Sequence, residues 1–240
     1  MSSEIMVHCP YCGSEEIARI LYGYVLGWEN SDKDCILGGC VVSGNDPRYY
    51  CHECEEGFGK PPVYREGDRG FDDRILLPDV VIGVEFTIGD YYCGHDTVRI
   101  VREGSSGAIC VNHFPTAADD LFYVREYSEA EWKELMDKFF YELFVHEWKR
   151  EYYNNVVPDR RQWNLVFHLK DGDVYSICGR HEYPPLFGEL EKMFRDYMAQ
   201  EVPLETDESK WTQFQYLFRN DSLVSGLLKS GRRDGFPVRV

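Results

Sequence analysis

Apolar and polar positions alternate along several stretches in the middle of the chain, and this alternation predicts β-strands. Residues 82–88 place an apolar side chain at every second position, with Glu85 among the residues between them, which is typical of a half-buried strand. Residues 97–102 and 108–114 flank a Gly-Ser-Ser-Gly segment and predict a hairpin, and residues 121–127 predict a further strand. The pattern indicates an antiparallel sheet in this part of the chain.

An amphipathic helix is predicted directly after these strands. Ser128 and Glu131 have the spacing of a capping box, in which the serine hydroxyl accepts from a first-turn amide and the glutamate reaches back. Apolar side chains then recur at helical spacing: Trp132, Leu135, Met136, Phe139, Phe140 and Leu143. We expect this helix to weaken near Asn154 and to end before Pro158, because proline disfavours helical geometry in the preceding residue.

A second hairpin and a second helix follow. Residues 163–169 alternate, Asp171-Gly172 supplies a type I′ turn, and residues 174–178 return alongside. The second helix carries its apolar stripe at Leu186, Leu190, Met193, Phe194 and Tyr197. A third helix is expected around Trp211, where apolar residues again recur.

The order of these elements predicts an α+β fold and a division of the chain. Strands, helix, hairpin and helix are typical of an antiparallel sheet with two or three helices packed on one face. Residues 61–75 are rich in proline and charge, which predicts a linker, because prolines remove backbone donors and the charges are costly to bury. We expect an N-terminal module at 1–60, this linker, an α+β domain at 76–200, and a C-terminal helix and tail at 201–240.

Two Cys-x-x-Cys knuckles dominate the N-terminal module. Cys9 and Cys12 form the first, and Cys51 and Cys54 form the second. Four thiolates presented as two such pairs are the donor set of a tetrahedral Zn²⁺ site, with Zn–S bonds of about 2.3 Å. Two matched pairs in one short segment favour a shared metal over redox dithiols or inert cysteines, with iron as the alternative metal. The expected cofactor is one structural Zn²⁺.

Further residues around the knuckles carry a family resemblance. Gly13 and Gly57 follow the two knuckles, and we expect them to leave room for backbone amides near the sulfurs. The segments CPYCGS, ILYGY, LGGC and YYCHEC resemble the zinc-ribbon superfamily, in particular the N-terminal module of uncharacterised bacterial zinc-ribbon proteins. The resemblance covers roughly a quarter of the 240 residues. It implies a metal site and a small β-fold, and no activity comes with it.

Other cysteines and histidines offer alternative chemistry. Cys93, His95 and His113 form a candidate second metal site or a cysteine–histidine nucleophile, because the predicted hairpin places all three near its open end. The competing interpretation is an exposed loop pair and a surface histidine. Cys35 and Cys40 lie between the knuckles. They either supplement or exchange with the metal ligands, or they are small buried hydrophobic side chains.

The charge and the cysteine count bear on partners and compartment. The chain has 42 acidic and 26 basic residues, a formal net charge of −16, and residues 1–60 alone carry ten acidic and four basic side chains. Such a field repels phosphate backbones and anionic membranes. No stretch approaches the roughly eighteen apolar residues of a spanning helix. Nine cysteines, an odd number, together with no N-terminal signal pattern, favour a cytoplasmic setting.

From these features we expect a non-enzymatic zinc-binding adaptor that acts through protein–protein contact, with a partner that the sequence does not identify. A four-thiolate set leaves no open coordination position for catalysis. Tyrosine pairs at 49–50, 91–92 and 152–153 are expected at the surface, where tyrosine suits interfaces. The alternatives are a nucleic-acid-binding ribbon, against which the charge argues, and an enzyme that uses the alternative cysteine–histidine site. No common nucleotide-binding or hydrolase motif occurs.

Overall fold

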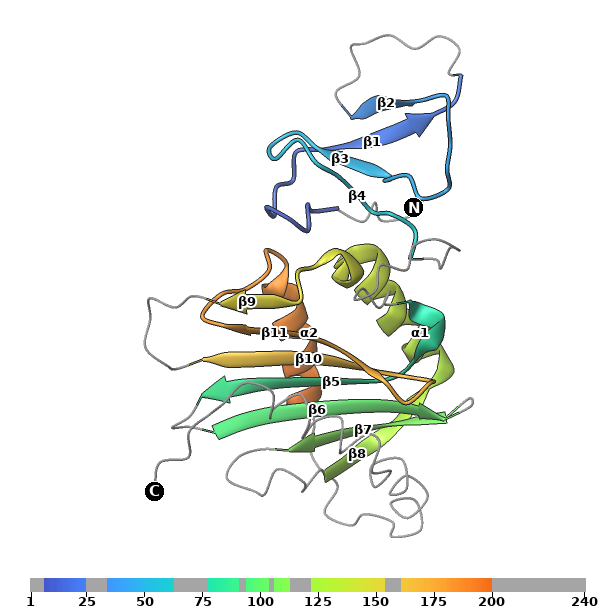
Figure 1. The fold of residues 1–240 in the computed structure, drawn as a ribbon. Helices are drawn as coiled ribbons and strands as arrows, with labels where there is room; N and C mark the ends of the chain where they lie inside the picture. The colour runs from blue at the N-terminus through green and yellow to red at the C-terminus, as the bar shows by residue number, and fades with distance from the viewer. Residues whose placement is uncertain are drawn as a thin grey trace.

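The structure is a computed structural model in which the described residues form two sheets (Figure 1). It describes residues 7–24, 34–62, 77–90, 94–103, 106–112, 122–153 and 161–199. The small sheet lies near the N-terminus and carries the cysteine knuckles. The larger sheet carries the helices and forms the body of the protein.

The small sheet, which we call the ribbon, has four strands in the order β2-β1-β3-β4. They are β1 (Ile17–Tyr22), β2 (Cys35–Gly39), β3 (Tyr49–Cys51) and β4 (Gly57–Phe58). β1 pairs antiparallel with β3 and parallel with β2. Since β1 begins just after the first knuckle and β3 ends at the second, their pairing places the two knuckles side by side.

The larger sheet has seven strands in the order β8-β7-β6-β5-β10-β11-β9. They are β5 (Val81–Asp90), β6 (Gly94–Glu103), β7 (Ser106–Asn112), β8 (Phe122–Ser128), β9 (Glu151–Tyr153), β10 (Gln162–Leu169) and β11 (Val174–Arg180). Neighbouring strands pair antiparallel, except that β9 lies parallel to β11. A short 3₁₀ turn, η1 (Pro78–Val80), leads into β5. Both predicted hairpins are present, as β6–β7 and β10–β11.

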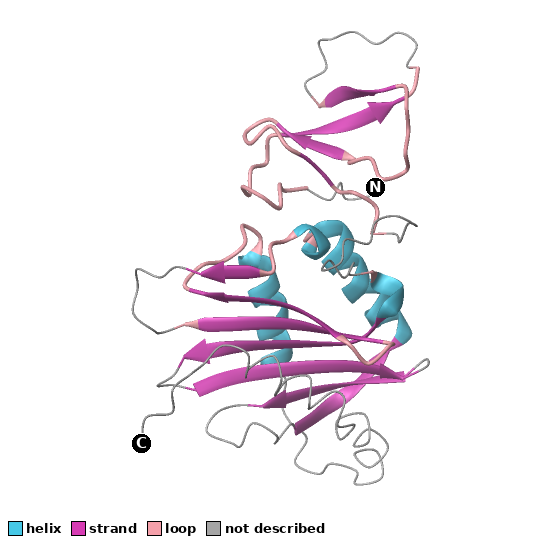
Figure 2. Cartoon of the chain, in the orientation of Figure 1, coloured by secondary structure: helices cyan, strands magenta, loops and turns pink. Residues whose placement is uncertain are grey.

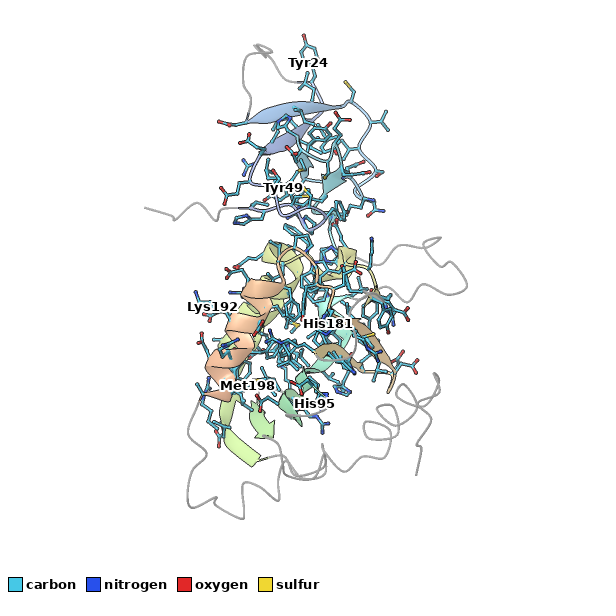
Figure 3. All side chains as sticks on the ribbon, turned by 90° about the vertical axis from the view of Figure 1, so that its left-hand side faces the viewer. Tyr24, Tyr49, His95, His181, Lys192 and Met198 are labelled. Atoms are coloured by element: carbon cyan, nitrogen blue, oxygen red, sulfur yellow. The ribbon has the colours of Figure 1, made fainter. Side chains whose placement is uncertain are left out.

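Helices lie on one face of this sheet, which confirms the predicted α+β class. α1 (Glu129–Asp137) continues into a π-helical turn, η2 (Lys138–Glu142), and α2 (Phe187–Met198) follows the second hairpin. Figure 2 shows α1 and α2 behind the sheet, and Figure 3, turned toward its edge, shows α2 on one side of the strands. The expected third helix around Trp211 lies outside the described residues. No helix in the described ranges is long and apolar enough to cross a membrane.

The main core fills the space between these helices and the sheet. The predicted capping box starts α1: the Glu131 amide donates to Ser128 Oγ at 3.2 Å, and the Ser128 amide donates to Glu131 Oε2 at 2.8 Å. Phe86 on β5 stacks on Phe194 of α2, with ring centroids 4.6 Å apart. The buried side chains of this cluster all come from residues 81–194. The larger sheet and its helices therefore have a core of their own.

The first helix ends earlier than its apolar stripe predicts. Phe144 adopts a left-handed backbone conformation with φ 52° and ψ 43°. A 3₁₀ turn, η3 (Val145–Glu147), and then strand β9 follow, so the prediction of a helix reaching toward Asn154 is wrong. Left-handed geometry costs about 1–2 kcal/mol for a residue other than glycine. Tertiary contacts must therefore hold Phe144, and they come from the ribbon.

Strand β5 is buried on both faces, and not on one face as its alternation predicts. Glu85 is 5% exposed and forms an ion pair with Arg99, its neighbour across the β5–β6 pairing. His168 on β10 pairs with Gly83 and lies on the same face, with 1% of its surface exposed. The paired charges are buried together, because an unpaired charge at this depth would be far more costly.

Candidate metal centre

Four cysteine sulfurs converge where the two knuckles meet. The Sγ atoms of Cys9, Cys12, Cys51 and Cys54 all lie within 4.8 Å of one another. Cys9 Sγ lies 3.6 Å from Cys54 Sγ, and Cys12 Sγ lies 3.5 Å from Cys51 Sγ. These separations exclude disulfides, whose S–S bond is about 2.05 Å. The sulfurs are thus free thiols gathered into one compact group.

Both knuckles are closed by the same backbone pattern. The Cys9 amide donates to the Ser14 carbonyl at 3.0 Å, and the Cys51 amide donates to the Glu56 carbonyl at 3.0 Å, five residues ahead in each case. The antiparallel register of β1 and β3 then places Ile17 opposite Cys51. Two equivalent loops joined by one strand pair therefore present their sulfurs to a common point.

The residue after each knuckle turns the chain through a left-handed conformation. Gly13 has φ 79° and Glu55 has φ 59°. Gly57, which we expected to leave room for backbone amides near the sulfurs, does not occupy this left-handed position in the second knuckle. Gly57 begins β4, where an added Cβ would lie 2.9 Å from Pro47 Cγ, so glycine is required there by close packing. The left-handed position of the second knuckle carries a glutamate at a conformational cost of about 1–2 kcal/mol.

The thiols by themselves resist accumulating negative charge. Burial, followed by hydrogen bonds with neighbouring thiols, raises the pKa of Cys54 to about 12. Burial also raises the pKa of Cys9. At Cys51 burial acts in the same direction, but the Cys54 amide and the Cys12 thiol outweigh it and lower the pKa to about 7. A bound dication would stabilise all four thiolates together.

This arrangement fits Zn²⁺. A tetrahedron with Zn–S bonds of about 2.3 Å has sulfur–sulfur edges of about 3.8 Å, close to the separations of the two nearest pairs. The Tyr11 amide points to Cys9 Sγ at 3.4 Å, an N–H···S contact of the kind that offsets thiolate charge. The four cysteines would hold the ion in a closed site, where it contributes folding energy and offers no open position for a substrate.

A small core next to the cysteine cluster includes one residue from the chain between η2 and η3. Cys9, Cys51, Phe58 and Phe144 form a buried cluster. The Phe144 ring meets the Phe58 ring edge-on with centroids 5.3 Å apart, and it meets Tyr49 at 6.2 Å. Phe144 is 3% exposed. The ribbon core is therefore completed from outside, which explains the left-handed turn that ends the helix.

Glu147 holds the ribbon at two points. Its Oε2 accepts from the Tyr11 hydroxyl at 2.6 Å, and its Oε1 accepts from the Lys60 amide at 2.8 Å. The Glu147 side chain is 7% exposed, and His146 Nε2 lies 3.1 Å from the Lys60 carbonyl oxygen. Burial, and then the bond to Glu147, raises the pKa of Tyr11, so its hydroxyl stays a donor. Hydrogen bonds to a charged group are the stronger class, about 1.5–3 kcal/mol each.

The other candidate residues do not join the sulfur cluster. Cys35 is half-buried in β2, and Cys40 is exposed and not a buried hydrophobic side chain. His95 is exposed on β6, and Figure 3 shows it low on the larger sheet, away from the ribbon. Cys93 and His113 lie outside the described residues, so their association with His95 stays a prediction. Within the described ranges, no other such group offers three or more metal-binding side chains.

The sequence pattern did not predict the residues that join the ribbon to the larger sheet and its helices. Phe144 follows Phe140 by four positions and therefore fits the helical stripe, so the pattern concealed its separate role. Glu147 lies in a charged stretch without any motif.

The tyrosines expected at the surface are only partly exposed: Tyr152 is 7% exposed and Tyr153 is 48% exposed. Tyr49 is partly buried against Phe58, at 5.4 Å between ring centroids.

Comparison of the chain with protein-family models, with curated proteins and with solved structures finds no match. The interpretation of the site therefore depends on the geometry and chemistry of the four cysteines.

Proposed function

We propose that this chain is a non-enzymatic zinc-binding adaptor, in which a structural zinc ribbon and an α+β domain act by contact with a partner protein. The observation that carries the proposal is the convergence of four cysteine Sγ atoms within 4.8 Å. Four thiolates complete the coordination shell of Zn²⁺, so the metal serves structure and leaves no site for a substrate. A module whose metal serves only its structure would act by presenting its surface to a partner protein.

The ribbon is presented as a firmly held surface. Phe144 completes its core, and Glu147 binds it at Tyr11 and at Lys60. A ribbon held in this way loses little orientational freedom when it binds, and such preorganisation favours recognition. We assign the module to the zinc ribbons, in line with its resemblance to uncharacterised bacterial proteins of that kind. A reducing cytoplasm suits its free thiols.

Cobalt substitution tests the closed site. Full-length protein reconstituted with Co²⁺ should show thiolate-to-metal charge-transfer bands and the spectrum of tetrahedral four-sulfur coordination. Added imidazole or cyanide should leave this spectrum unchanged, because no coordination position is open. A spectrum that changes with these ligands would indicate an exchangeable position and would favour a catalytic metal over the adaptor.

Cross-linking followed by affinity purification tests the partner. Zinc-loaded full-length protein should recover the same protein repeatedly from cells that make this chain naturally. The Cys9→Ser variant, with its metal site broken, should lose that protein if the ribbon takes part in the contact. Recovery of nucleic acid in place of protein, or of nothing with either form, would count against an adaptor.

A further inference from the structure

A cavity on the ribbon gathers positive charge in an otherwise acidic protein. Its volume is about 390 Å³, within the range of sites that take small groups, roughly 300–1,000 Å³. It is lined by Arg19, Ile20, Tyr22, Val42, Gly44, Asp46, Arg48, Tyr49 and Pro61. Two of the four basic residues of the segment 1–60 thus lie at one hollow, while the chain as a whole has a net charge of −16.

The backbone fixes the positions of both arginines, and their charges have no ion-pair partner among the described residues. The Arg19 amide donates to the Asp34 carbonyl at 2.7 Å, and the Arg48 amide donates to the Phe58 carbonyl at 3.0 Å. Neither guanidinium forms an ion pair or hydrogen bond with any residue in the described ranges. The Arg48 guanidinium lies 6.0 Å from the centroid of the Tyr141 ring, at the outer limit of a cation–π contact.

The one carboxylate in the lining is already bound within its own loop. Asp46 Oδ2 accepts from the Ser43 amide at 2.6 Å and from the Gly44 amide at 3.0 Å. Asp46 Oδ1 accepts from the Ser43 hydroxyl at 3.0 Å. These bonds hold the Asp46 carboxylate in its loop but leave its charge in place, so two guanidinium groups and one carboxylate give the lining a net charge of +1. The cavity therefore favours an anion.

The rest of the lining is apolar, and its aromatic rings are already packed. The Tyr22 hydroxyl donates to the Pro47 carbonyl at 2.8 Å, and its ring covers Gly38, where an added Cβ would lie 2.3 Å from Tyr22 Cε1. Tyr49 stacks on Phe58 at an interplanar angle of 29°. Rings held in this way are poorly placed to stack on a nucleic-acid base, which is how single strands are usually bound.

We propose that this cavity binds an acidic side chain, next to an aliphatic or aromatic one, from a segment of the partner protein. This inference rests on the proposed adaptor function and gives the chemistry of the contact. A carboxylate would meet Arg19 and Arg48, and its apolar neighbour would meet Ile20, Val42 and Pro61. The guanidinium fork matches a carboxylate with two parallel hydrogen bonds.

The short distance over which charges act at physiological salt favours a single carboxylate over a nucleic-acid strand as the ligand. At physiological salt, charges are screened over about 8 Å, so the local lining decides the binding of one carboxylate. A nucleic-acid strand carries a charge on every nucleotide and runs well beyond the cavity. There it meets a segment with ten acidic and four basic residues, which repels it.

Peptide selection tests the proposal. A displayed library of random short peptides is selected on zinc-loaded full-length protein, and the enriched peptides are synthesised and titrated. We expect Asp or Glu beside an aliphatic or aromatic residue. The double variant Arg19→Gln/Arg48→Gln should bind these peptides about tenfold more weakly or worse, the loss expected from removing charged hydrogen bonds. Lys60→Gln removes a ribbon charge outside the lining and should leave binding unchanged.

A cycle between protein and peptide adds specificity to the test. Replacing the acidic residue of the peptide by its amide should weaken binding to the wild type about as much as the arginine substitutions do. It should have little further effect on the double variant, because the same contact is already lost. Zinc content and thermal melting establish whether the variants are folded. If the double variant does not fold, the two single arginine variants replace it in the titrations.

Four results would overturn the proposal. Enriched peptides without an acidic residue would do so, as would equal binding to the wild type and the double variant, or no enrichment at all. Equal binding would rule out this site and leave the adaptor function unaffected. Failure of the wild-type protein to recover any partner protein in the cross-linking experiment would instead rule out the adaptor function itself. Arginine-dependent binding of oligodeoxythymidylate that displaces the peptides would assign the cavity to single-stranded nucleic acid.

Discussion

Replacing Phe144 by alanine tests whether the larger domain completes the ribbon core. The ring is 3% exposed and contacts Phe58 and Tyr49. Phe→Ala substitutions in packed cores cost about 3–5 kcal/mol. Phenylalanine and alanine are equally unsuited to the left-handed backbone at this position, so the loss reports packing and not backbone strain. We expect the ribbon to lose about 3–5 kcal/mol of stability.

Hydrogen exchange of the zinc-loaded variant locates this loss. A change of 3 kcal/mol corresponds to exchange roughly a hundredfold faster in β1 and β3, at about 1.4 kcal/mol per tenfold. The larger domain should change little, because Phe144 is not among the buried residues of its core cluster. Glu142→Ala is the matched control, since Glu142 is exposed at the end of the π-helical turn η2, two residues before Phe144. Unchanged exchange in the ribbon of Phe144→Ala would refute the shared core.

Metal removal extends the same experiment to the division of the chain. Chelation should unfold residues 1–60, because a ribbon of this size depends on its metal for folding. The α+β domain should keep a cooperative melt, supported by its separate core. Loss of protection across both halves together would show one cooperative unit, and the division between residues 60 and 76 would then have to be withdrawn.

The remaining predictions need simpler assays. Metal analysis should find one zinc per chain, lost in Cys9→Ser and kept in Cys35→Ser; two equivalents, or disulfides without metal, would contradict the assignment. Titration at near-physiological salt should detect only weak binding to duplex DNA and single-stranded RNA, and sub-micromolar affinity with a steep salt slope would contradict this. Glu55→Gly should stabilise the second knuckle by up to about 1 kcal/mol in urea unfolding, because glycine tolerates positive φ. Burial, and then Arg99, lowers the pKa of His168 to about 3. The unfolded side chain has a pKa near 6.5, so between about pH 6.5 and 3 the unfolded state binds a proton that the folded state does not. The free energy of unfolding should therefore fall as the pH drops through this range, by at most about 1.4 kcal/mol per pH unit. His168→Gln should reduce this slope.

The cysteine cluster could be predicted from the sequence because its signal is largely local. The spacing within each Cys-x-x-Cys pair predicts a knuckle, and a tetrahedral ion needs two such pairs. The two pairs in this chain therefore point to Cys9, Cys12, Cys51 and Cys54, whose sulfurs the structure brings together. The capping box at Ser128 and the two hairpins are also local patterns, and all are present. Each knuckle, the capping box and each hairpin depends on residues close together in the sequence, whereas the meeting of the two knuckles joins Cys12 to Cys51, 39 positions away.

Features that depend on distant contacts needed the tertiary structure. Phe144 matches the helical stripe in sequence, yet it leaves the helix because the ribbon core has a place for its ring. Glu85 alternates like a solvent-facing residue, yet it is buried because Arg99 on the next strand neutralises it. The sequence by itself identified the four clustered cysteines and the α+β class, through short-range spacing and periodicity. Only the tertiary structure decided how the ribbon joins the larger domain, because that depends on side chains brought together from positions far apart in the chain.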